Sequence, residues 1–229
     1  MNRITSVIMM HARDRLTWFF LPWGIVLSSF LINVIIGVVL GGNTPIYTGG
    51  LSSIYIYMLV VGAATLKETF PFALGFSVRR RDYYLGTLLM IIGVSAISAL
   101  LIWLLALIEG SLVPNWGISL HFFHLPYLND GSLVEQLCIY FVLMVCMVLL
   151  GFVFASTFQR FRRTGLYSLF ATLGMFLSLF SILATYWNWW GNIFGWFAQE
   201  TAFDLALWML PVIAVCGLAS YTLLRKATA

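Results

Sequence analysis

The sequence predicts an all-α integral membrane protein with six transmembrane helices, an N-terminal interfacial helix and both termini in the cytoplasm. Hydrophobic residues make up 62% of the 229 residues and charged residues only 9%, whereas soluble domains average roughly 45–50% and about 25%. Apolar runs long enough to cross a bilayer recur along the chain. Lysine and arginine fall only in alternate connecting segments. We therefore expect residues 1–229 to form a single transmembrane domain.

The first sixteen residues predict the interfacial helix. Apolar residues and a histidine follow the i, i+3, i+4, i+7 spacing of one helix face, at Ile4, Val7, Ile8 and His11. Such a helix lies in the membrane interface. The alternative is a frayed basic tail that only sets the orientation of the chain.

Six apolar runs predict the membrane spans, each bounded by polar or charged residues. They cover about 18–40, 47–66, 84–108, 133–158, 166–186 and 203–224. All twelve lysines and arginines lie before the first span, after the sixth, or in the segments that follow the second and the fourth. Because short cytoplasmic segments retain basic residues, both termini are expected in the cytoplasm.

The segment 67–83, between the second and third spans, is long, apolar and basic at once. Its large apolar side chains are costly to expose to water, so we expect them to bury against lipid headgroups, neighbouring helices or a partner protein. Ser77 is placed to cap a short helix whose first turns hold Arg79 to Asp82. The alternative is that this segment is only the basic collar of the third span.

Residues 70–87, with the sequence FPFALGFSVRRRDYYLGT, resemble the segment between the second and third spans of bacterial type-2 ABC transporter permeases. The matching positions are Leu74, Gly75, Ser77, Arg80, Arg81, Asp82, Tyr83 and Gly86. Val78 and Arg79 are inserted relative to the family's pattern. The resemblance implies a half-transporter whose segment 67–83 docks into a separate ATPase. The coupling residues it implies are Phe70, Phe72, Leu74, Phe76, Ser77, Arg79, Arg80, Arg81 and Asp82.

The resemblance also implies the assembly: two ATPase subunits and a second permease subunit, identical or homologous to this chain. No Gly-x-x-x-x-Gly-Lys-Ser/Thr loop occurs, so ATP and Mg are expected on the partner ATPase. We therefore expect no enzymatic activity, cofactor or metal site in this chain. The basic residues flank hydrophobic spans, so topology explains them better than nucleic-acid binding.

The uncharged spans suggest export of an amphiphilic or hydrophobic substrate across a bacterial cytoplasmic membrane, in contact with membrane lipids. A secondary transporter, or a scaffold or immunity protein acting without ATP, are the alternatives. Ion-driven carriers usually bury charged residues near the membrane midplane, and these spans carry none there. His121 and His124 with Asp130 could form a metal site, but a loop that covers the outer end of the bundle is the favoured interpretation.

Overall fold

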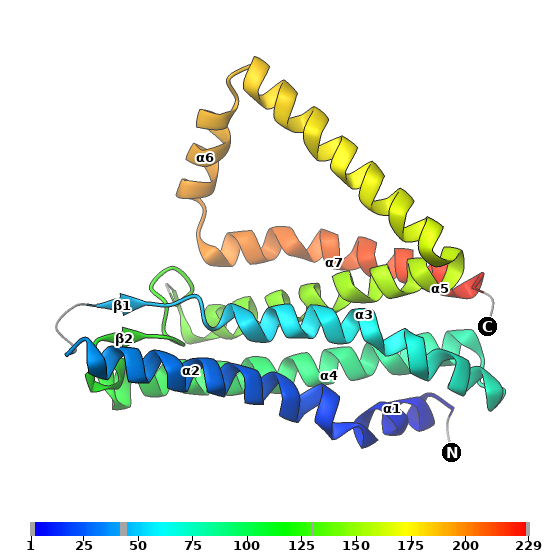
Figure 1. Ribbon diagram of the computed structural model, residues 1–229, viewed down its shortest axis with the longest axis horizontal. Helices are drawn as coiled ribbons and strands as arrows, with labels where there is room; N and C mark the ends of the chain where they lie inside the picture. The colour runs from blue at the N-terminus through cyan, green and yellow to red at the C-terminus, as the bar shows by residue number, and fades with distance from the viewer. Residues whose placement is uncertain (1–2, 42–44, 130, 228–229) are drawn as a thin grey trace.

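The computed structural model describes residues 3–41, 45–129 and 131–227, and they fold into a helical bundle from which one helical arm projects (Figure 1). The helices are α1 (Arg3–Arg13), a π-helical turn (Leu16–Phe20), α2 (Leu21–Val39), α3 (Ser52–Gly75), α4 (Arg80–Leu107), a second π-helical turn (Ile108–Leu112), a 3-10 turn (Pro114–Gly117), α5 (Leu133–Tyr186), α6 (Trp190–Gln199) and α7 (Ala202–Arg225). Strands β1 (Ile46–Tyr47) and β2 (Leu120–His121) form a short parallel pair.

Four helices of the described part are long and apolar enough to cross a membrane. They are Leu16–Val39, Arg80–Leu112, Leu133–Tyr186 and Ala202–Arg225. The prediction of an all-α chain with apolar helices of membrane length is confirmed. The number of membrane crossings and the sidedness of the termini stay predictions.

The helix that carries the second predicted span does not end with that span at residue 66. Helix α3 continues to Gly75 and contains Pro71, so most of the predicted connecting segment 67–83 is helical. Leu66, Phe70 and Ala73 lie at helical spacing and are all buried, and this shared face explains why the helix continues. The true turn between α3 and α4 is residues 76–79, which we call the α3–α4 turn.

The predicted fourth and fifth spans are two arms of α5. The helix breaks at Arg162, whose backbone has φ 59° and ψ −150°. Gly165 permits the break, because a Cβ there would lie 2.3 Å from the Cβ of Phe161. The first arm packs in the bundle, whereas the second arm and α6 extend away from it (Figure 1), and residues 171–183 are exposed. The residues between the fifth and sixth predicted spans largely form helix α6.

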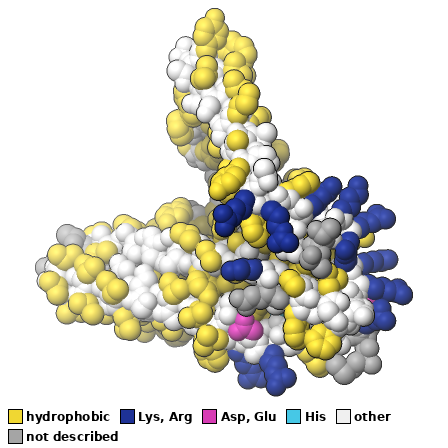
Figure 2. All heavy atoms as spheres, turned by 45° about the vertical axis from the view of Figure 1, so that its right-hand side comes forward, with side chains coloured by type: hydrophobic (Ala, Val, Ile, Leu, Met, Phe, Trp, Pro, Cys, Tyr) yellow, Lys and Arg dark blue, Asp and Glu magenta, His cyan; other side chains and the backbone are white. Residues whose placement is uncertain are grey.

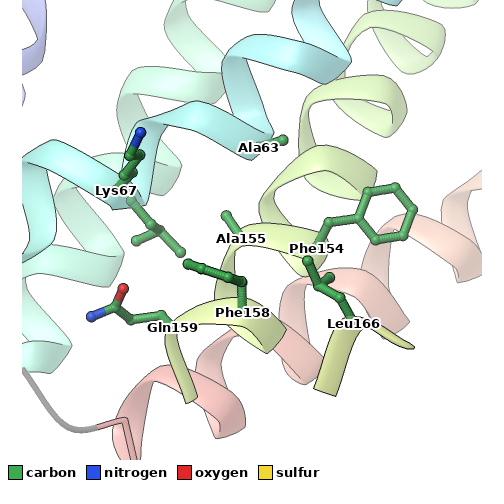
Figure 3. A pocket seen from close by; sticks show the side chains of 8 residues that line it. Ala63, Lys67, Phe154, Ala155, Phe158, Gln159 and Leu166 are labelled. Carbon is green, nitrogen blue, oxygen red and sulfur yellow. The ribbon is translucent and has the colours of Figure 1, made fainter. Parts of the chain in front are cut away.

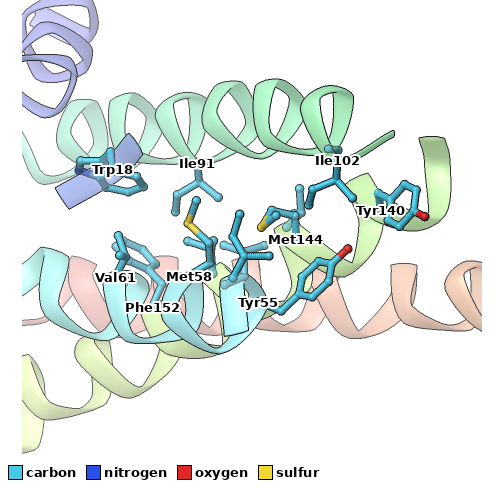
Figure 4. Packing of buried hydrophobic residues seen from close by; sticks show 14 of the residues in the cluster. Trp18, Tyr55, Met58, Val61, Ile91, Ile102, Tyr140, Met144 and Phe152 are labelled. Atoms are coloured by element: carbon cyan, nitrogen blue, oxygen red, sulfur yellow. The ribbon is translucent and has the colours of Figure 1, made fainter. Parts of the chain in front are cut away.

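The core of the bundle lies between α3, α4 and the first arm of α5 (Figure 4). Two glycines bring α3 and α5 into backbone contact. A Cβ on Gly62 would lie 2.1 Å from the carbonyl oxygen of Val148, and one on Gly151 would lie 1.9 Å from that of Leu59. Small residues allow such close approach in membrane helices, where dispersion contacts rather than water exclusion hold helices together.

At the end of the bundle where α4 finishes, a buried carboxylate organises the loop that follows. The Glu109 side chain is fully buried and accepts hydrogen bonds from the backbone N–H groups of Phe122 and Phe123 and from the indole of Trp116, at 2.8–2.9 Å. The side chains of Phe122 and Phe123 are also buried. The described residues offer no group of three metal ligands, and Asp130 of the candidate metal site lies outside them.

The opposite end is strongly basic, and we call it the basic end. Figure 2 shows lysine and arginine side chains gathered there and at the base of the projecting arm. The start of α1, the α3–α4 turn, the break in α5 and the end of α7 all lie at this end (Figure 1). The segments that carry lysine and arginine in the sequence thus lie together in space.

Candidate functional site

The α3–α4 turn is closed by the backbone at the end of α3. The N–H of Ser77 donates to the carbonyl of Leu74 at 2.9 Å, and that of Val78 to Ala73 at 3.2 Å. With Ser77 at φ 57°, this is the Schellman pattern that ends helices. The prediction that Ser77 caps the next helix is wrong. Arg79 occupies the N-cap position of α4 in extended conformation, without a side-chain cap.

The apolar residues of this segment divide into a buried and an exposed set. Phe70 is fully buried and Leu74 packs against the core. Phe72 and Phe76 are 56% and 71% exposed, and their ring centroids lie 4.8 Å apart in an edge-to-face contact. We call Phe72 and Phe76 the aromatic pair. It presents an apolar surface at the basic end, beside the turn.

The three consecutive arginines have different environments. Arg79, the last residue of the turn, and Arg81, in the first turn of α4, are exposed. Arg80 is half-buried and donates from Nη1 to the carbonyl oxygen of Arg225 at 3.0 Å, which ties the start of α4 to the end of α7. Asp82 lies in the first turn of α4, where a negative charge is favoured by the helix dipole.

Tyr83 joins the two helices across the turn. Its hydroxyl lies 2.6 Å from the hydroxyl of Thr69. Because Thr69 donates its own proton to the carbonyl of Thr65 at 2.5 Å, Tyr83 is the donor in this pair. The Tyr83 ring also meets Phe70 edge to face at 5.3 Å. The last part of α3 and the first turn of α4 are therefore fixed to each other.

Helix α1 packs on the next turn of α4, at Gly86 and Thr87. The predicted apolar face of α1 contacts the protein, since Val7 and His11 are buried. Gly86 makes this contact possible, because a Cβ there would lie 2.7 Å from the Cβ of Val7. The Nε2 of His11 lies 3.0 Å from the Thr87 hydroxyl. Burial lowers the pKa of His11 from 6.5 to about 4. The negative charge of Asp14 raises this pKa, but the effect of burial is larger.

A crevice of about 150 Å³ lies between α3 and the two sides of the break in α5 (Figure 3). Its lining is apolar apart from Lys67 and Gln159. Small-molecule sites usually occupy about 300–1,000 Å³, so this space is too small for an amphiphilic cargo. Its lining residues show that α3 lies beside the break in α5.

Comparison of the chain with family models, with curated proteins and with solved structures finds no match. Function is therefore inferred from the residues and the geometry of the basic end.

Proposed function

We infer that this chain is the membrane-spanning permease subunit of an ATP-binding cassette transporter, driven by separate ATPase subunits that bind ATP and Mg. The aromatic pair carries this inference. Phe72 and Phe76 are large, apolar and exposed, and they belong to the last part of α3, which lies at the basic end (Figure 1). Exposed aromatic side chains with a polar rim are typical of protein interaction sites.

The surroundings of the aromatic pair indicate what its partner looks like. Arg79, in the α3–α4 turn that follows the pair, is exposed. A groove with an apolar floor and an acidic rim would complement this surface in shape and charge. Such a groove on an ATPase subunit matches the role that the family resemblance gives to segment 67–83.

The contacts around the turn supply a route for transmitting movement. A push on the aromatic pair acts on the end of α3, and the Tyr83–Thr69 hydrogen bond passes it to α4. From α4, Arg80 contacts the end of α7 and Thr87 contacts His11 of α1. Rigid-body rocking of helices against one another is an established mode of switching. The turn would therefore move several helices together.

The substrate class, the direction of transport, the topology and the assembly are proposed from the sequence. The apolar bundle suits export of an amphiphilic or hydrophobic substrate across a bacterial cytoplasmic membrane, with six crossings, both termini cytoplasmic, and a second permease subunit, identical or homologous. The buried carboxylate of Glu109 is engaged in three hydrogen bonds. Because these hydrogen bonds occupy the carboxylate, they argue against the alternative of an ion-driven carrier, which needs a charged group free to bind and release ions.

The experiment that tests the proposal is purification of the tagged chain from its native host in mild detergent, with identification of copurified proteins and measurement of ATP hydrolysis. We expect a stoichiometric ATPase subunit that carries a phosphate-binding loop. Recovery of the chain alone under several gentle conditions would overturn the proposal and favour a scaffold or a carrier that works without ATP.

A further inference from the structure

A groove of about 670 Å³ opens on the side of the bundle between α4, the first arm of α5 and α7. Its walls are apolar, formed mainly by leucine, isoleucine and valine side chains. Tyr84 also lines it, but its hydroxyl donates to the carbonyl of Gly217 at 2.8 Å. Arg81 is the charged residue among the described residues that line the groove.

The dimensions of the groove match one leaflet of a bilayer. Along α4 it extends from Arg81 to Ile92, a rise of roughly 16 Å at 1.5 Å per residue. The hydrocarbon core of a bilayer is about 30 Å thick, so half of it is about 15 Å. An acyl chain lying along the groove would therefore have its polar end beside Arg81.

The basic residues at the polar end of the groove determine which lipid headgroup would bind there. Arg81 is exposed and belongs to the basic end, and the hydrogen bond from Arg80 to the Arg225 carbonyl brings the end of α7, with Arg225 and the following Lys226, close to the start of α4. Asp82 is not among the lining residues. Basic residues at the polar end of a cleft between membrane helices favour acidic lipid headgroups over zwitterionic ones.

We propose that this groove is a binding site for an anionic phospholipid from the leaflet that contacts the basic end. One acyl chain lies between α4 and α7, and Arg81 contacts the phosphate headgroup. This site is separate from the aromatic pair and does not depend on ATPase coupling. A lipid bound there contacts both the start of α4 and α7, at the level of the α3–α4 turn. It would therefore stiffen the basic end of the bundle.

Native mass spectrometry of the purified full-length chain tests the proposal, with phosphatidylglycerol and phosphatidylcholine of identical acyl chains as probes. We expect phosphatidylglycerol to bind about fivefold more tightly, since one basic residue near a headgroup contributes about that factor. The substitution Arg81→Gln should remove this preference. The matched control is Arg79→Gln, an exposed arginine two positions away that does not line the groove.

A second pair of variants tests the apolar part. Ala214 lines the groove and is exposed, so Ala214→Phe should fill it without disturbing the core and should weaken binding of both lipids. Val215→Phe, on an exposed neighbour outside the groove, should leave binding unchanged. Three results would overturn the proposal: equal binding of the two lipids, equal loss in Arg79→Gln and Arg81→Gln, or a change of oligomeric state in Ala214→Phe with lipid binding unaltered.

Discussion

The hydroxyl groups of Thr69 and Tyr83 lie 2.6 Å apart and join α3 to α4 at the basic end. They are fourteen residues apart in the sequence, on either side of the α3–α4 turn. This bond fixes the helix that carries the aromatic pair to the helix that carries the three arginines. The end of α3 and the start of α4 are thus joined across the turn.

Removal of the Tyr83 hydroxyl should weaken this junction. Tyr83→Phe keeps the buried ring and its contact with Phe70 but loses one hydrogen bond and leaves the Thr69 oxygen with one partner fewer. We expect a loss of about 1 kcal/mol in stability, seen as a melting temperature lower by a few degrees in detergent. Tyr186→Phe, at a side chain 79% exposed, is the control. Equal melting temperatures would contradict a stabilising role for the bond.

Docking of α1 on α4 should weaken as the pH falls. Burial lowers the pKa of His11 from 6.5 to about 4, so undocked α1 binds more protons than docked α1 between these values. The stabilisation is complete above about pH 6.5 and is lost as the pH falls towards 4. Linkage gives a loss of about 2 kcal/mol at pH 5.

Hydrogen exchange of the α1 amides at pH 7.5 and pH 5, corrected for intrinsic rates, measures this effect. His11→Gln retains a hydrogen-bonding group opposite Thr87 but does not titrate. Protection of α1 should fall at pH 5 in the wild-type chain and stay constant in this variant. A pH-dependent loss of the same size in His11→Gln would assign the effect to another group.

The sequence predicted the helices well where apolar runs end at charged residues. Predicted spans 84–108 and 203–224 agree with α4 and α7 to within a few residues. Helix α3 extends past the second predicted span to Gly75, because Lys67 interrupts the hydropathy but not the helical face of Leu66, Phe70 and Ala73. Helical periodicity carried the correct signal there.

The candidate site was predicted in outline only. Composition indicated an apolar, basic segment, but it gave Phe70, Phe72 and Phe76 the same role, although the fold buries the first and exposes the others. Contacts from distant segments, such as His11 with Thr87, were not predicted because they depend on how α1 folds back onto α4. The position of His11 on the apolar face of α1 was the one available signal.

The glycine contact between α3 and α5 should be intolerant of even one methyl group. Gly151→Ala would place a Cβ 1.9 Å from the carbonyl oxygen of Leu59, so the helices must separate. We expect a loss of about 1–3 kcal/mol, the usual cost of overpacking. Gly93→Ala is the control within α4, since its Cβ would have no neighbour within 4 Å. Thermal melting of both variants measures the difference, and a melting temperature of Gly151→Ala equal to that of Gly93→Ala would refute the close contact.

Loss of the Glu109 charge should loosen the loop after α4. In Glu109→Gln, one of the three N–H donors from Trp116, Phe122 and Phe123 would face an amide N–H₂ group. An unpaired buried polar group costs about 1–3 kcal/mol, so hydrogen exchange at residues 113–125 should accelerate. Glu135→Gln, which keeps an acceptor for the N-cap of α5, should not change it. Unchanged exchange in Glu109→Gln would mean that the loop is held by its aromatic packing alone.

The most direct test of the proposed function is the amount of ATPase subunit that copurifies with the double variant Phe72→Ala, Phe76→Ala. The aromatic pair is exposed, so the variant should insert and melt like the wild-type chain. Phe194→Ala, at a side chain 64% exposed on α6, is the matched control. We predict a stoichiometric ATPase with the control and at least a tenfold loss with the double variant. Equal recovery of the ATPase from both variants would contradict the role of the aromatic pair in docking.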